Sequence, residues 1–373
     1  MSVFLNYEQF FALPKAKRNL VIYSEGMADW LHISSLVEAL IENENYPFVY
    51  ISSDNSDPGL KLKSTLVETF LTDKGGVRAN LFAKMDADVL LMTTPDLQNL
   101  SLKKSARCGK YVYVFHSPVS THMIYRPGAF DHFDVVFCVG PHHMEEIRQQ
   151  ERLTGGQPKQ LIAHGYGRVD SLLRDHKSAK SSSTQTNKHV LIAPSWGPNG
   201  IFETMGSELT SVLLDNGFFV TARPHPQTIA KSSYAIEELR QSFDGHANFQ
   251  LQTNMGKNDA LYESDVMISD WSGAAIDYAF GLEKPVLFID TPRKVNNPGY
   301  EDIGLEPMEV QIRERIGRLV SPEDLHQIPN AINEILSQSK KRSAVMNSER
   351  HRWIYNVGSS AGLGASELVR ISA

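Results

Sequence analysis

Cysteine is nearly absent from this sequence, which has only Cys108 and Cys138 in 373 residues. Two cysteines cannot form a disulfide framework or, alone, a zinc site, so we expect a reducing, cytoplasmic environment. No apolar run approaches the roughly 18 residues that a membrane-spanning helix needs. The N-terminal stretch MSVFLNYEQFFALPKAKRNL lacks a cationic start followed by a long apolar core, so we expect no secretory signal. Contact with the inner face of the cytoplasmic membrane stays open.

The sequence also lacks an excess of positive charge. Its formal net charge is −6 and its pI is about 6.1, which argues against a nucleic-acid partner. A local basic pocket for an anionic metabolite remains compatible with these values. Hydrophobic residues make up 41% and charged residues 21%, as in an ordinary soluble protein. A chain of this length predicts two domains.

Three common nucleotide and hydrolase motifs are missing. The sequence has no Walker loop, no Gly-x-Ser-x-Gly elbow, and no Gly-x-Gly-x-x-Gly after the first predicted strand. These absences argue against a nucleoside triphosphatase, an α/β hydrolase and an ordinary NAD enzyme.

Short apolar runs alternate with helical patterns along the whole chain, which is typical of a parallel α/β architecture. We predict two Rossmann-like domains facing across a cleft, residues 1–174 and 189–350, with a polar, serine-rich linker at 175–188. Residues 351–373 form a tail that is a candidate to pack back on the first domain. The predicted strands are NLVIYSE, FVYISSD, ADVLLMT, YVYVFHS, DVVFCVG, KQLIAHG, HVLIAPS, FFVTARP, NFQLQT, DVMISD and PVLFID. Helical patterns include residues 28–42, 141–153 and much of 320–350, and a glycine-rich turn leads into a last short helix near residue 360.

Unusual residues gather at the carboxyl ends of these strands, where open α/β sheets bind ligands. In the first half they are Ser24-Glu25-Gly26 and His116-Ser117-Pro118. In the second half they are PSWG (194–197), RPHP (223–226) and DWSG (270–273). The sequence therefore predicts a site built from these turns.

The segment DVMISDWSGAAIDYAFGLEKPVLFID (265–290) reads as strand, tight turn, helix and strand. Ser272 and Gly273 would begin the helix, where free N–H groups and the helix dipole favour an anion. The alternative is that Asp270 or Ser272 only caps the helix, and the segment alone does not decide between the two.

Arg223 and His225 would suit a diphosphate, because they supply a forked cation and a titratable donor. Each could instead be a surface or core residue, but their position one strand before the serine–glycine turn favours binding. His116 ends an apolar strand and could be a general base on a hydroxyl or a buried structural histidine.

Several histidines follow in sequence, but their spacing matches no standard zinc pattern. The residues are His122, His132, His142 and His143. We therefore predict no metal site and no cofactor, and we expect the His142-His143 pair to be exposed at the start of a helix.

With these residues in view, the chain resembles the CDP-glycerol glycerophosphotransferase family, whose members build teichoic-acid-type polymers. The resemblance runs in order through residues 110–290, whereas the first hundred residues match only in architecture. The segments that carry it are VFHSPVSTHM, FDVVFCVGPHHMEEI, HGYGRVDSLL, LIAPSWG, RPHP and ISDWSGAAIDYA.

The resemblance implies a glycosyltransferase-B-type fold and the transfer of a polyol phosphate, glycerol phosphate first, from a CDP-linked donor to a glycan or lipid-linked acceptor, releasing CMP. It implies that His116 activates the acceptor and that His225 assists the departing CMP. The donor phosphates would be bound by Arg223, His225, Asp270, Ser272, Gly273 and Ser195. Further candidates are Glu25, Gly26, Arg168 and Asp277.

The chain departs from the family pattern in several places. Ser117 replaces a glycine, Gly167 a proline, Ser195 a threonine and Gly273 a serine, and Gly197 stands where a basic residue is common. These departures leave the donor open between CDP-glycerol, CDP-ribitol and a nucleotide sugar. A glycosyltransferase, a sugar-nucleotide epimerase and a non-catalytic nucleotide-binding subunit remain alternatives. The acceptor, the linkage, processivity and the oligomeric state stay open.

Overall fold

The computed structural model describes residues 3–178, 187–254 and 259–372. Its strands form two sheets, and every strand runs parallel to its neighbours. The strands are β1 Leu20–Ser24, β2 Phe48–Ser52, β3 Val67–Leu71, β4 Val89–Met92, β5 Lys110–Val114, β6 Val135–Cys138, β7 Gln160–Ala163, β8 His189–Ile192, β9 Phe219–Ala222, β10 Phe249–Leu251, β11 Val266–Ser269, β12 Val286–Ile289 and β13 Gly317–Val320.

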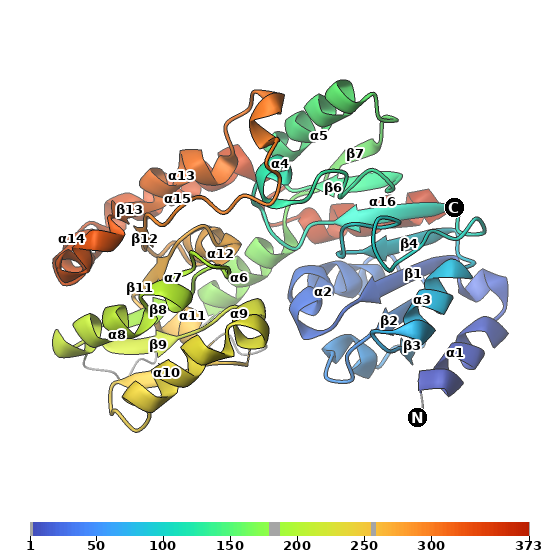
Figure 1. Cartoon of the computed structure of the whole chain (residues 1–373). Coiled ribbons are helices and arrows are strands. Elements are labelled where there is room, and N and C mark those ends of the chain that lie inside the picture. The colour runs from blue at the N-terminus through green and yellow to red at the C-terminus, as the bar shows by residue number, and fades with distance from the viewer. Residues whose placement is uncertain (1–2, 179–186, 255–258, 373) are drawn as a thin grey trace. The chain divides into compact units, whose positions relative to one another are not determined.

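The helices connect these strands in sequence order (Figure 1). The α-helices are α1 Val3–Ala12, α2 Met27–Glu42, α3 Gly76–Ala83, α4 Thr121–Ile124, α5 Pro141–Thr154, α6 Gly167–Ser178, α7 Ile201–Thr204, α8 Gly206–Asp215, α9 Pro226–Lys231, α10 Ser233–Phe243, α11 Asp259–Glu263, α12 Gly273–Leu282, α13 Met308–Ile316, α14 Ile328–Ser337, α15 Ser339–Trp353 and α16 Ser360–Ser372. Four 3₁₀ turns are described: η1 Lys15–Lys17, η2 Pro58–Lys61, η3 Tyr300–Ile303 and η4 Pro322–Gln327.

The chain divides by its contacts into two compact units. Unit 1 comprises Met1–Asp170, Asn296–Leu305 and Trp353–Ala373, and unit 2 comprises Ser171–Val295 and Glu306–Arg352. Of the predicted linker, residues 175–178 belong to α6 and residues 179–186 lie outside the described part of the chain.

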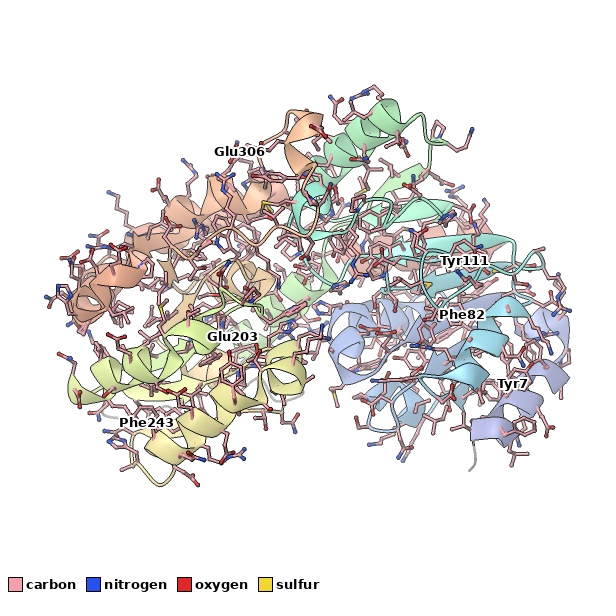
Figure 2. All side chains as sticks on the ribbon, in the orientation of Figure 1. Tyr7, Phe82, Tyr111, Glu203, Phe243 and Glu306 are labelled. Carbon is pink, nitrogen blue, oxygen red and sulfur yellow. The ribbon has the colours of Figure 1, made fainter. Side chains whose placement is uncertain are left out.

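Unit 1 holds a sheet with the order β3-β2-β1-β4-β5-β6-β7. The order reverses between β1 and β4, the type of position at which Rossmann-like sheets bind ligands. One face of the sheet packs on α2 and α16, whose apolar side chains share a core with β1, β2, β4, β5 and β6. On the other face, Phe82 of α3 packs edge-on against Tyr23, with the two ring centroids 4.9 Å apart; Phe82 is labelled in Figure 2.

Unit 2 holds a sheet with the order β10-β9-β8-β11-β12-β13, which reverses between β8 and β11. One face of this sheet is covered by a single apolar core, to which four helices contribute: α7, α8, α10 and α14. The central strands β8, β11 and β12 are fully buried, which explains why they read as continuous apolar runs. Two Rossmann-like α/β domains are therefore present, as predicted.

The structure confirms each predicted strand and the helices at 28–42 and 141–153. It adds β3 and β13, which the sequence did not predict. β3 is the edge strand of its sheet and carries VETFL, in which polar residues interrupt the apolar ones. β13 is also an edge strand, and its short sequence GRLV begins with glycine and arginine. Edge strands need fewer apolar side chains, so their sequences give weaker signals.

Candidate functional site

The second-unit candidates lie on turns at one edge of the sheet. Ser195 follows β8, Arg223 follows β9, and Asp270 follows β11. Because β9, β8 and β11 are adjacent parallel strands, their carboxyl ends lie side by side. The turns after β8 and β11 flank the position at which the strand order reverses. The fold of unit 2 therefore brings together the residues that the sequence singled out.

Asp270 connects two of these turns. Its Oδ1 accepts a hydrogen bond from the Ser195 backbone N–H at 2.7 Å, across 75 residues of chain. Burial raises the pKa of Asp270, while the hydrogen bonds from Ser195 and the charge of Lys294 oppose that shift. Oδ2 is buried and has no hydrogen-bond partner among the described residues. Asp270 therefore links the turn after β8 to the turn after β11 through Oδ1, while Oδ2 stays without a partner among the described residues.

The serine–glycine turn begins α12 as predicted. Ser272 is the N-cap, and its Oγ accepts a hydrogen bond from the Ala274 N–H at 3.3 Å. Gly273 is the first residue of the helix. Asp277 lies one turn further along and is half-buried. Ser272 thus caps α12, and the start of this helix lies at the same edge of the sheet as Ser195.

Arg223 and His225 lie on the turn between β9 and α9. Arg223 is buried, and its backbone N–H donates to the Ile192 carbonyl at 2.8 Å. His225 is the N-cap of α9, where its Nδ1 accepts a hydrogen bond from the Gln227 N–H at 3.1 Å. Because Nδ1 accepts, the proton of the neutral ring lies on Nε2. The turn therefore presents an imidazole donor beside a guanidinium.

The sequence did not predict the roles of three further residues at this edge. Trp196 stacks on His225 at 6.2 Å with an interplanar angle of 29°, and Lys231 and Lys294 lie over its indole ring. Trp196 belongs to a motif noted above, but the two lysines are 63 positions apart. Only the fold shows that they share one ring.

In unit 1, His116 follows β5 and is half-buried. Its Nδ1 lies 3.1 Å from the Thr93 carbonyl oxygen and 3.4 Å from the Tyr113 hydroxyl. A carbonyl oxygen can only accept a hydrogen bond, so Nδ1 carries the proton in the neutral ring. Nε2 then has a lone pair available. This is the tautomer that a general base needs at Nε2.

Several polar groups surround His116 that the sequence did not single out. His32 lies 6.2 Å from it ring to ring, and Tyr166 donates to its backbone carbonyl at 3.3 Å. Burial lowers the pKa of His32 well below its usual value, and the charges of His116 and Arg168 add to the effect. Burial raises the pKa of Asp29, on which the charge of His116 acts in the opposite direction. Asp29 lies three residues after Gly26, a spacing that could have drawn attention to it.

Glu25 and Gly26 lie between β1 and α2, at the point where the strand order of unit 1 reverses, and Gly26 is the N-cap of α2. Gly26 has φ = +143°, and a Cβ there would lie 2.6 Å from Asp54 Cβ, so only glycine fits. The Glu25 carboxylate pairs with Arg78 at 2.9 Å. Burial raises the pKa of Glu25, as does the nearby Asp29, whereas Arg78 lowers it. Arg168 is buried near the start of α6.

Helix α5 holds the segment that follows His116. His142 Nε2 donates to the Pro118 carbonyl and His143 Nε2 to the Val119 carbonyl, each at 2.8 Å. Glu146 Oε2 accepts from the Thr121 N–H at 2.6 Å. The prediction that the His142-His143 pair is exposed was therefore wrong, because the rings are buried where they bind these carbonyls.

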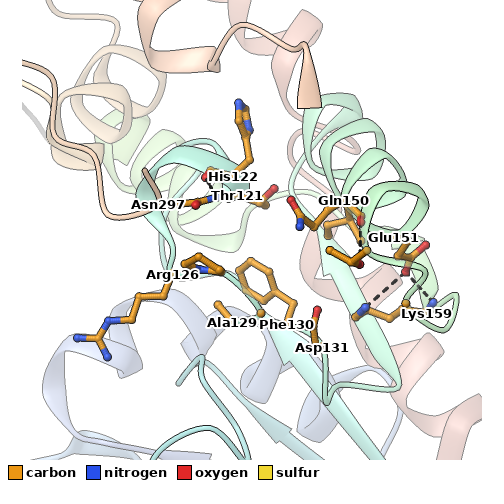
Figure 3. Close-up of a pocket in the computed structure, with 15 residues that line it drawn as sticks. Thr121, His122, Arg126, Ala129, Phe130, Asp131, Gln150, Glu151, Lys159 and Asn297 are labelled. Carbon is orange, nitrogen blue, oxygen red and sulfur yellow. Dashed lines mark hydrogen bonds and ion pairs between the residues drawn. The ribbon is translucent and has the colours of Figure 1, made fainter. Parts of the chain in front are cut away.

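A pocket lies between α5 and the segment 121–131, with Asn297 at its rim (Figure 3). Lys159 and Glu151 form an ion pair at 3.5 Å on one side, while Arg126 points away from the pocket. No predicted site residue is among its described lining. Across residues 3–178, 187–254 and 259–372, no three His, Cys, Asp or Glu side chains are grouped to hold a metal ion. Likewise, no helix in these ranges is long and apolar enough to cross a membrane.

Residues 122–293 match the family model described as CDP-glycerol:poly(glycerophosphate) glycerophosphotransferase. The resemblance read from the sequence is confirmed. The matched region includes the turns that carry Ser195, Arg223 and Asp270, whereas His116 precedes it. No curated protein sequence matches this chain.

Solved structures share the fold of the whole chain. A histidine-to-asparagine variant of the wall teichoic acid polymerase TagF has a TM-score of 0.61 at 14% identity, covering 98% of this chain and 93% of that one. A putative UDP-N-acetylglucosamine 2-epimerase from Listeria monocytogenes has a TM-score of 0.57 at 13% identity, covering 94% of each chain. The S. aureus MnaA–UDP co-structure has a TM-score of 0.58 at 11% identity, again covering 94% of each chain. At these identities the likeness shows the two-domain glycosyltransferase-B-type fold alone.

Proposed function

We propose that this protein transfers glycerol phosphate from CDP-glycerol to a hydroxyl group of a glycan or polyol acceptor, releasing CMP, in the synthesis of a teichoic-acid-type or capsular surface polymer. The observation that carries the proposal is the family match over residues 122–293. The geometry of His116, Arg223 and His225 supports it, since each presents a group that one step of this transfer needs.

His116 would act on the acceptor. Its Nδ1–H donates to the Thr93 carbonyl, so Nε2 can take the proton of the acceptor hydroxyl. The hydroxyl oxygen forms a new bond to the phosphorus that carries glycerol, and the bond from that phosphorus to the bridging oxygen breaks. CMP leaves with that oxygen and the electron pair of the broken bond. Phosphoryl transfer of this kind relies mainly on positioning and charge stabilisation.

The unit 2 residues would hold the donor. Arg223 and the Nε2–H of His225 would donate to its phosphate oxygens, and His225 would stabilise the charge that develops on CMP. The Gly273 N–H at the start of α12, beside Ser272, would bind a further phosphate oxygen. In this proposal unit 1 carries the acceptor side and unit 2 the nucleotide side.

We also propose that the protein works without a metal ion, in the cytoplasm, at the inner face of the membrane where lipid-linked acceptors are present. Fractionation of cells that produce the protein would test the location, and activity in excess EDTA would test the metal independence.

The experiment that tests the reaction is incubation with CDP-glycerol and candidate acceptors, followed by mass measurement of the product. We expect a gain of one glycerol phosphate per transfer and stoichiometric CMP. A gain of a bare sugar with a nucleotide-sugar donor would instead support the alternative glycosyltransferase function. Thermal-shift measurements with CMP, CDP, UDP and GDP provide a separate check, and selective stabilisation by UDP would count against a CDP-linked donor.

A further inference from the structure

Two lysine ammonium groups share one indole ring in unit 2. Lys231 Nζ and Lys294 Nζ each lie 4.4 Å from the centroid of the Trp196 ring. Lys231 ends α9, which follows the Arg223 turn, and Lys294 lies on the segment after β12. Trp196 is half-buried and also stacks on His225. Two cations are thus held beside the proposed phosphate-binding turns.

Neither ammonium group forms a direct ion pair with another residue that the structure describes. Among the described residues, no carboxylate lies within 4 Å of either Nζ, and neither Nζ makes a hydrogen bond. The pKa of Lys294 is lowered to about 8, mainly by burial and in smaller part by the charge of Lys231, while the charges of Asp270 and Glu203 oppose the shift. The site therefore keeps two like charges close together at an energetic cost.

Lys284 of the same unit shows how a structural lysine is satisfied. Burial lowers its pKa to about 8 as well, but its Nζ donates to the backbone carbonyls of Tyr262 at 2.6 Å and Ser264 at 2.7 Å. Lys294 is buried to a similar extent, but its Nζ donates to no such carbonyl among the described residues. A buried or half-buried cation that lacks a protein partner is suited to an anionic ligand.

We propose that Lys231 and Lys294 bind the second phosphate charge of a nucleoside diphosphate, so that the site holds a diphosphate-linked donor more tightly than a nucleoside monophosphate. This inference rests on the proposed function, which puts the donor phosphates at these turns. It adds a reason why the site binds the donor more tightly than the product CMP. Once transfer has occurred, CMP lacks the second phosphate, and the two lysines favour its replacement by a new donor.

The strand order supports this assignment. Trp196 follows β8 and the Lys294 segment follows β12, and β11, with Asp270 at its end, lies between these strands in the sheet. All the groups named here therefore belong to one edge of a single sheet. The indole ring holds the ammonium groups in place through cation–π contact, which leaves their N–H bonds available to phosphate oxygens.

The test is to measure the dissociation constants of CDP and CMP by calorimetry for the full chain and its variants. For Lys231→Met combined with Lys294→Met, we expect the dissociation constant of CDP to rise about tenfold or more, as for the loss of a hydrogen bond to a charged group, and that of CMP to change less than about twofold. Lys294→Arg should keep most of the preference for CDP. Lys188→Met is the matched control, because Lys188 is exposed and precedes β8 at the opposite edge of the sheet.

An equal loss of affinity for CDP and CMP, or no loss for either in a variant with the normal melting temperature, would overturn the inference. Melting curves identify a variant that fails to fold, and the single variant Lys231→Met, at an exposed position, then takes the place of the double one. The same measurement with UDP and UMP separates this inference from the proposed function. If the chain binds uridine rather than cytidine nucleotides, the CDP-linked donor is wrong, and the diphosphate-to-monophosphate ratio still tests the two lysines.

Discussion

Glu146 on α5 accepts two hydrogen bonds from one residue, Thr121, through the backbone N–H at 2.6 Å and the side-chain hydroxyl at 2.7 Å. Its other oxygen pairs with His122 at 3.3 Å. Burial would raise the pKa of Glu146, but the hydrogen bond to His122 and the neighbouring imidazoles lower it to about 2. This carboxylate therefore anchors the segment that begins at His116, without touching His116 itself.

We predict that Glu146→Gln lowers kcat while leaving the affinity for CDP unchanged. An amide cannot accept the Thr121 and His122 bonds with the same charge, so the segment after His116 should lose its fixed position. Glu145→Gln is the matched control, since Glu145 is the adjacent, exposed residue of α5. Steady-state kinetics with calorimetry for CDP provide the measurement. An equal loss of turnover in both variants would show that Glu146 has no special role.

The role of His116 as base is tested by His116→Ala. We expect turnover to fall by about 10²- to 10⁴-fold, the usual contribution of a general base, while CDP still binds. His351→Ala, at an exposed histidine of α15, should leave both quantities unchanged. Normal turnover in His116→Ala would rule out the assignment of His116 as the base.

Arg223 should act on binding itself. We predict that Arg223→Ala weakens CDP binding by about 10- to 100-fold, because a hydrogen bond between charged groups contributes about 1.5–3 kcal/mol. Arg240→Ala is the control, since Arg240 is an exposed residue that pairs with Glu237 on α10. Calorimetric titration with CDP measures the dissociation constant of both variants. Equal constants for Arg223→Ala and Arg240→Ala would contradict a contact between Arg223 and a phosphate.

The buried histidines predict an acid-sensitive fold. Burial lowers the pKa of His143 to about 3, so on acidification below the unfolded value of 6.5 the unfolded chain takes up a proton that the folded chain refuses. For this one residue we expect the free energy of unfolding to fall by about 2 kcal/mol between pH 7 and pH 5. The pKa of Glu146 is lower in the folded chain than in the unfolded one. Its contribution to the free energy of unfolding is therefore complete above pH 4.5 and is lost as the pH falls from 4.5 toward 2.

Urea unfolding at pH 7 and pH 5 measures this effect. His143→Gln should reduce the loss between the two pH values by about 2 kcal/mol. His326→Gln, at an exposed position, should leave the loss as it is in the unaltered chain. A pH dependence that is the same in both variants would place the acid sensitivity elsewhere.

The sequence predicted those parts of the fold in which local pattern and burial agree. Central strands such as β8 and β11 are buried on both faces and therefore read as apolar runs, whereas β3 and β13 lie at sheet edges and do not. The turn carrying Arg223 was predictable because its two prolines and two polar side chains interrupt a strand pattern. The exposure assigned to His143 was wrong because its partner, the Val119 carbonyl, lies 24 residues away.

Some residues of the candidate site could be predicted from the sequence, and others could not. Ser195 and Asp270 follow strands, so the rule that ligands bind at strand ends selects them without any knowledge of their contact. Lys294 follows no motif, and its relation to Trp196 depends on which strands are neighbours. A single sequence records the position of a lysine but not the ring on which it lies.

The chain passes between its two units at residues 170–171, 295–296, 305–306 and 352–353. Helix α16, at the C-terminal end, belongs to unit 1 and packs on α2 through Ala365 and Leu368. If two related chains were joined at the serine-rich segment 175–188, α2 would come from one chain and α16 from the other, so each would lose its own partner helix. Chimaeras of this scaffold therefore require the unit 2 sequence to be inserted between retained N-terminal and C-terminal pieces, with residues 296–305 kept from the recipient.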